Sequence, residues 1–186
     1  HLPRSADGGR PLCCGRTFLA AGLVKEAKAE AQRTLDCLSS FASRGIPIIG
    51  LEPSCLLTLR DEFWALRLDG VVTELSENAF LFEEFLAAEI ETGHCKLNLE
   101  ALPQKRALMH GHCHQKAFNA MESVEKVLAL IPDLKVERVN SSCCGMAGAF
   151  GYEAENYDIS MRIGELSLLP AIRDEDTDSL IIADGT

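Results

Sequence analysis

Two things are scarce in this sequence: long hydrophobic runs and basic residues. No apolar stretch approaches the roughly 18–20 residues that a membrane-spanning helix requires, so we expect no transmembrane segment. The chain carries 18 lysines and arginines against 28 aspartates and glutamates, a formal net charge of −10 at pH 7. A nucleic-acid-binding groove gathers basic residues, so this balance argues against a nucleic-acid partner. With 47% hydrophobic and 25% charged residues, the composition is that of a globular protein rather than a disordered chain.

Cysteine is the residue in excess, with eight among 186 residues. A secreted disulfide scaffold would be shorter, richer in cysteine and poorer in aliphatic core residues. Two of the cysteine sites are adjacent pairs, whose Cα atoms lie ~3.8 Å apart, less than the usual disulfide span of ~4.4–6.8 Å. We therefore expect metal binding or redox chemistry in a reducing compartment. The cysteines are Cys13, Cys14, Cys37, Cys55, Cys95, Cys113, Cys143 and Cys144.

Helical and extended segments alternate along the chain. Residues that favour helices predict them over 22–42, 55–65, 115–130 and 152–169, together with one that Ser76 caps and that runs to Ile90. Short aliphatic runs predict strands at 46–50, 106–109, 135–139 and 179–183. This alternation predicts an α/β fold with a mostly parallel sheet.

The motif Cys-Cys-Gly occurs twice, at 13–15 and at 143–145, and each copy precedes a helical stretch and an aliphatic strand. If the two copies are repeats, the counterpart of Cys55 falls just beyond the last residue, and that of Cys113 falls before the first. A repeat this long indicates fused domains rather than a solenoid. We therefore expect two pseudo-repeated Rossmann-like modules, both truncated, over residues 1–100 and 101–186.

The paired cysteines favour an iron–sulfur cluster, because adjacent thiolates repel each other unless a cation holds them. Glycine after each pair lets the backbone approach a bulky inorganic group and adopt a positive φ. A third cysteine in each half follows a predicted strand. Ligand sites of parallel sheets lie at the carboxyl ends of the strands, which is where these cysteines are expected. The candidate metal ligands are Cys13, Cys14 and Cys55 in the first module and Cys113, Cys143 and Cys144 in the second. His112 and His114 are further candidates, with helix capping as the open alternative.

These motifs, with their PSC and HCH flanks, resemble the cysteine-rich CCG domains of iron–sulfur oxidoreductases, which include one subunit of heterodisulfide reductase and the iron–sulfur subunit of glycolate oxidase. Longer strings are similar to the carboxyl-terminal part of fused FAD-linked D-2-hydroxyacid dehydrogenases, of the D-lactate and D-2-hydroxyglutarate type. The strings are GLEPSCLLTLRDE (50–62), LFEEFL (81–86), GHCHQKA (111–117), CCGMAGAFGYE (143–153) and IIADGT (181–186).

The resemblance implies an iron–sulfur electron-transfer module, with a [4Fe–4S] cluster, inside a longer oxidoreductase. An upstream FAD domain would oxidise the hydroxyacid, and a ferredoxin-like segment would follow it. Electrons would then pass from FAD through clusters to a quinone, a cytochrome or another carrier. This part of the polypeptide would hold no part of the FAD site and could not oxidise substrate alone. We expect it in the cytoplasm, either free or peripheral on the inner face of the membrane.

One position departs from the family pattern. Heterodisulfide reductase-type domains end the motif with CxxC, whereas Thr58 stands three residues after Cys55. A five-thiolate noncubane cluster therefore does not follow for the first module, and a cubane cluster, a cluster shared across the halves, or zinc stays open. Two other functions also stay open: a zinc-stabilised docking or structural module without a redox role, and thiol–disulfide catalysis like that of heterodisulfide reductase.

Overall fold

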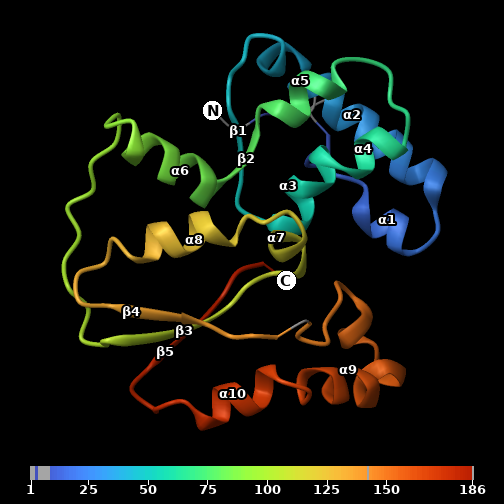
Figure 1. The fold of residues 1–186 in the computed structure, drawn as a ribbon. Coiled ribbons are helices and arrows are strands. Elements are labelled where there is room, and N and C mark those ends of the chain that lie inside the picture. Colours follow the sequence, from blue (N-terminus) through green and yellow to red (C-terminus); the bar gives the residue numbers. More distant parts are fainter. Residues whose placement is uncertain (1–2, 4–8, 142, 186) are drawn as a thin grey trace. The chain divides into compact units, whose positions relative to one another are not determined.

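The computed structural model describes residues 3, 9–141 and 143–185, and the chain divides into two compact units, residues 1–82 and 83–186 (Figure 1). Both units combine helices with short parallel strands, which confirms the predicted α/β class. Within the described part of the chain, none of the helices combines the length and apolar character that a bilayer crossing needs. The boundary predicted at residue 100 separates the two modules of a sequence repeat and is a different division from that of the compact units. Both this boundary and the repeat stay predictions.

The first unit contains a two-stranded parallel sheet, in which Ile48 of β1 pairs with Ala79 of β2 and Gly50 pairs with Leu81. Its longest helix buries one stripe of small and aliphatic residues spaced about four apart, as an amphipathic helix requires. The elements are α1 (Arg16–Ala20), α2 (Val24–Ala42), β1 (Ile48–Gly50), α3 (Pro53–Arg60), α4 (Glu62–Ala65), α5 (Val72–Glu77) and β2 (Ala79–Leu81). The buried stripe of α2 is Ala27, Ala31, Leu35, Leu38 and Ala42.

The second unit contains a three-stranded parallel sheet in the order β4-β3-β5. Helix α8 lies on one side of this sheet and α10 on the other (Figure 1). The elements are α6 (Phe82–Glu91, whose first residue ends the first unit), β3 (Arg106–His110), α7 (Cys113–Ala117), α8 (Met121–Leu128), β4 (Lys135–Arg138), the 3-10 turns η1 (Phe150–Tyr152) and η2 (Ala154–Asn156), α9 (Tyr157–Gly164), α10 (Leu168–Asp174) and β5 (Leu180–Ala183).

The central strand β3 supplies side chains to the core on both faces of the sheet, because successive residues of a strand point to opposite sides. Leu108 packs with Val139 and Leu168 on one face. Met109 packs with Met121 and Val124 on the other face. All three strands run parallel, so the segments that follow β3, β4 and β5 all leave the sheet at its carboxyl-terminal end. Cys113, Cys143 and Cys144 lie in the segments that follow β3 and β4 at this end of the sheet.

The predicted helix from Ser76 to Ile90 is wrong in its first half. Ser76 lies inside α5, and residues 79–81 form strand β2 before α6 begins. Phe82, Phe85 and Leu86 follow a helical period, whereas the three-residue strand before them is too short to show a period of its own. The parallel pairing with β1 therefore decides the local structure.

The long helices predicted over 115–130 and 152–169 are each broken. Asn119 adopts a left-handed conformation, with φ +56, between α7 and α8. In the later segment two 3-10 turns precede α9, which ends at Gly164. A side chain at Gly164 would place its Cβ 3.1 Å from the carbonyl oxygen of Cys144, so this end of α9 packs closely against the second cysteine pair.

Candidate metal centres

The cysteine pair of the first unit lies in a tight loop in front of α1. Gly15, the N-cap of α1, has a φ of +83 and donates its backbone N–H to Sγ of Cys13 at 3.4 Å. A Cβ at this position would lie 2.6 Å from the carbonyl oxygen of Ala27 on α2. Only glycine fits both the backbone conformation and this close approach, so the loop is pressed against α2.

The third cysteine of the first unit, Cys55, lies exposed in the first turn of α3, directly after β1. The Glu52 side chain caps this helix by accepting hydrogen bonds from the N–H of Ser54 at 3.2 Å and from its hydroxyl at 2.6 Å. Pro53 occupies the first helical turn, where its missing N–H costs nothing. The local sequence therefore fixes the start of α3 and with it the position of Cys55.

The structure brings Cys14 and Cys55 into direct contact. A hydrogen bond from the buried Cys14 thiol lowers the pKa of Cys55 to about 7, although burial and the charges of Glu52 and Cys13 oppose this shift. The same hydrogen bond, followed by burial, raises the pKa of Cys14. The pair therefore ionises first at Cys55, and the thiolate is the form that binds metals.

The cysteine pair of the second unit repeats this local arrangement. Gly145 has a φ of +96 and donates its N–H to Sγ of Cys143 at 3.3 Å, and Met146 donates its own to Sγ of Cys144 at 3.5 Å. A Cβ at Gly145 would lie 2.2 Å from the carbonyl oxygen of Ser160 on α9. In both units a helix therefore holds the loop closely, and backbone N–H groups point at the sulfur atoms.

Cys113 is the first residue of α7 and follows β3. The residue is exposed, yet protein atoms around its sulfur reduce solvation and raise its pKa, and the nearby Cys143 and Cys144 add to the shift. The ammonium of Lys116 interacts electrostatically with the same three cysteines. The loss of solvation at Lys116 outweighs the attraction of the three cysteines and lowers the pKa of this lysine. Its Nζ donates to the carbonyl oxygen of Ser141 at 2.7 Å. The second group thus consists of three thiols and one lysine.

Two buried polar side chains hold the loop that carries Cys113. Gln115 is fully buried, accepts the N–H of His112 at 3.0 Å, and donates to the carboxylate of Asp184, which follows β5. His110 lies against Ser141, with Nδ1 and Oγ 2.8 Å apart, and burial lowers its pKa to about 4. The imidazole of His110 is therefore neutral near pH 7.

His112 caps α7, because its Nδ1 accepts the N–H of His114 at 3.2 Å. The two imidazole rings stack with centroids 5.1 Å apart. The structure thus shows the capping role for His112, and metal binding by either histidine stays a prediction. Sequence reasoning missed Gln115 as the other half of this capping box, because serine or threonine usually occupies the N-cap and histidine rarely does.

The backbone N–H donors at the two cysteine loops are compatible with an iron–sulfur cluster, and zinc stays an open alternative. Among the residues that the structure describes, no three histidine, cysteine, aspartate or glutamate side chains are placed to hold one metal ion. A structural zinc ion draws four ligands to about 2.0–2.3 Å from a single centre. The thiolates of an iron–sulfur cluster bind different irons, so they can stand further apart. The backbone N–H groups that point at Sγ of Cys13 and Cys143 would stabilise thiolate ligands of such a cluster.

A family model described as a cysteine-rich domain, CCG, matches residues 107–186. A subunit of the anaerobic glycerol-3-phosphate dehydrogenase of Escherichia coli K12 is 30% identical over 154 residues, which are 82% of this chain and 38% of that protein. D-2-hydroxyglutarate dehydrogenase of the same strain is 32% identical over 156 residues, 82% of this chain and 14% of that protein. The chain therefore spans less than half the length of these curated relatives. No solved structure matched the chain.

Proposed function

We propose that the chain is an iron–sulfur electron-transfer module of a dehydrogenase, on the premise that residues 107–186 match the cysteine-rich CCG domain family. The observation that carries the proposal is the arrangement found in both units. A Cys-Cys-Gly loop directs backbone N–H groups at sulfur, and an exposed cysteine from the first turn of a helix interacts with the pair. Such N–H donors stabilise thiolate ligands and raise the potential of a bound cluster.

The chain's own residues would have separate tasks. When bound, an iron–sulfur cluster accepts and releases single electrons. In the first unit exposed Cys55, and in the second unit exposed Cys113, would hold a cluster of that unit at the solvent side, where a redox partner can approach. The Lys116 ammonium would offset part of the negative charge of the thiolates. The proposed ligands are Cys13, Cys14 and Cys55 in the first unit and Cys113, Cys143 and Cys144 in the second.

We further propose that the module serves a dehydrogenase that oxidises D-2-hydroxyacids through FAD and passes electrons to a quinone, a cytochrome or another carrier. The long matching strings and the similarity to D-2-hydroxyglutarate dehydrogenase support this substrate class. Glycerol 3-phosphate is the competing substrate, because the subunit of the anaerobic glycerol-3-phosphate dehydrogenase is similarly related. We propose that the protein lies in the cytoplasm, or peripherally at the inner face of the membrane, because its adjacent cysteine pairs indicate metal binding or redox chemistry in a reducing compartment.

The test is anaerobic purification of the full polypeptide that contains this chain, followed by metal analysis and EPR. We expect iron with acid-labile sulfide, and an EPR signal that appears on reduction with dithionite. Adding D-2-hydroxyglutarate or D-lactate should bleach the flavin and reduce the cluster, and glycerol 3-phosphate should not. Reduction by glycerol 3-phosphate alone would overturn the substrate class. A colourless protein with stoichiometric zinc and no iron would overturn the electron-transfer function.

A further inference from the structure

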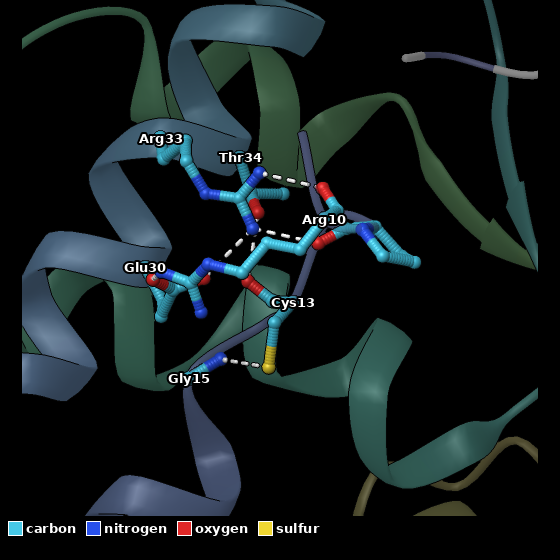
Figure 2. A network of polar contacts seen from close by, with 7 residues as sticks. Arg10, Cys13, Gly15, Glu30, Arg33 and Thr34 are labelled. Carbon is cyan, nitrogen blue, oxygen red and sulfur yellow. Dashed lines mark hydrogen bonds and ion pairs between the residues drawn. The ribbon is translucent and has the colours of Figure 1, made fainter. Parts of the chain in front are cut away.

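A buried carboxylate lies on α2, beside the cysteine loop of the first unit. Glu30 is only 4% exposed, and two guanidinium groups hold it (Figure 2). Arg33 donates to its Oε2 at 2.8 Å, and Arg10 forms an ion pair with its Oε1. A buried carboxylate is costly unless it is paired and hydrogen-bonded in this way. The apolar stripe of α2 does not account for this residue.

The same network reaches the backbone that leads into the cysteine pair. The Arg33 guanidinium also donates to the carbonyl oxygens of Pro11, at 2.7 Å, and Arg10, at 3.3 Å. The hydroxyl of Thr34 donates to the carbonyl oxygen of Cys13 at 2.7 Å (Figure 2). Side chains from one turn of α2 therefore contact two backbone positions in front of the Cys-Cys-Gly loop and one at its first residue.

Residues 10–14 lie outside any helix or strand, so no regular backbone ladder fixes them. In the second unit the corresponding segment follows β4, and Lys116 and His110 hold Ser141 two residues before Cys143. The position of Cys13 depends instead on contacts from α2, which is itself fixed by its buried stripe. A ligand loop gains precision when packed side chains on a rigid element support it.

We propose that Glu30, Arg33 and Thr34, here named the α2 clamp, are positioning residues that hold Cys13 and Cys14 in the geometry for metal binding. The part of the inference that concerns metal rests on the proposed iron–sulfur function and is tested by the release of iron. The part that concerns the loop is tested without metal, by the alkylation of its cysteines. Glu30 fixes the Arg33 guanidinium, Arg33 fixes the backbone at residues 10–11, and Thr34 fixes Cys13. Loosening any of these contacts should free the loop without removing a sulfur ligand.

The sharpest variant is Thr34→Val, which removes the hydroxyl and keeps the shape of the side chain. Thr34→Ser restores the hydroxyl and is the rescue variant. Ser39→Ala is the matched control, because the Ser39 hydroxyl bonds only to the Asp36 carbonyl of α2 itself. Glu30→Gln tests the carboxylate. Circular dichroism and urea unfolding of the full polypeptide show whether each variant is folded.

With metal bound, the readout is the rate at which a chelator removes iron from the first unit. This iron is identified as the share that is missing from a Cys13→Ser variant. We expect about a five- to tenfold faster release in Thr34→Val, the range for one lost hydrogen bond, with wild-type rates in Thr34→Ser and Ser39→Ala. The EPR signal that survives in Cys13→Ser should keep its line shape in Thr34→Val. Equal release from Thr34→Val, Glu30→Gln and wild type would overturn the proposal.

Without metal, the readout is the alkylation rate of Cys13 and Cys14 by iodoacetamide, measured by mass spectrometry. Cys14 is buried, so a freed loop should alkylate several-fold faster in Thr34→Val and Glu30→Gln than in Ser39→Ala. If the wild type binds no iron but these variants still alkylate faster, the α2 clamp stands and the proposed function falls. If alkylation is unchanged in both variants, the clamp is refuted whatever the metal content.

Discussion

At the scale of single residues, the glycine after each cysteine pair decides how closely its loop can approach a helix. Gly15 and Gly145 both have positive φ, and both would bring a Cβ within 3 Å of a helix carbonyl oxygen. The sequence shows these glycines but not the carbonyl groups they face, because those belong to residues 12 and 15 positions further along. The positive φ and the lack of room for a side chain therefore both require glycine at these positions. Alanine variants at two glycines can separate the two requirements.

Gly145→Ala should abolish iron binding to the second unit and destabilise the fold by more than Gly148→Ala does. Gly148 lies in the same loop, with φ +66 and no atom within 4 Å of an added Cβ, so its replacement costs only the left-handed strain of about 1–2 kcal/mol. Urea unfolding and iron analysis measure both effects. Equal stability losses in the two variants, with full iron content, would contradict the role of the close approach.

Lys116→Gln should lower the midpoint potential of the cluster in the second unit. The ammonium is a cation close to Cys113, Cys143 and Cys144, so its loss makes an added electron less favourable, by a few tens of millivolts or roughly 1 kcal/mol. Lys126→Gln is the control, because that lysine pairs with Glu91 and Glu122 on the surface. A redox titration followed by EPR gives both potentials. An unchanged potential in Lys116→Gln would show that the charge does not act on the cluster.

At the scale of elements, the sequence predicted the strands that aliphatic runs mark, such as 106–109 and 179–183, and the helix within 22–42. It did not predict β2, whose identity comes from pairing with β1, or the break at Asn119, which has no glycine or proline to signal it. The cysteines of the candidate sites were visible as motifs. Their polar supports were not, because Glu30 and Asp184 act on residues that only the tertiary fold brings near.

Glu30 ties α2 to the segment in front of the first cysteine pair, and this link should weaken in acid. Burial pushes the pKa of Glu30 up, but the hydrogen bonds from Arg33 and Arg10 outweigh burial and leave the pKa below its usual 4.5. The unfolded chain therefore takes up this proton more readily. The stabilisation is complete above about pH 4.5 and is lost as the pH falls through the lowered pKa.

Urea unfolding of wild type and Glu30→Gln between pH 7 and pH 3 measures this contribution. We expect Glu30→Gln to be about 1–3 kcal/mol less stable at pH 7 and the difference to shrink below pH 4.5. A difference that stays constant across this range would show that the carboxylate charge contributes nothing to the link.

At the scale of the whole molecule, the two units show a similar local arrangement at their cysteine pairs. Each has a Cys-Cys-Gly loop against a helix and a third cysteine in the first turn of another helix. This likeness supports the pseudo-repeat that the doubled motif predicts, and the repeat itself stays a prediction. The chain spans 38% of one relative and 14% of the other, and substrate oxidation outside this chain stays part of the proposed function.

The most direct measurement is the iron and sulfide content of the anaerobic full polypeptide, compared with a Cys113→Ser, Cys143→Ser, Cys144→Ser variant and with a Cys37→Ser control. We predict bound iron with acid-labile sulfide in the wild type and the control, and loss of the second unit's share in the triple variant. Iron content that is unchanged in the triple variant, or absent from the wild type, would contradict the central claim.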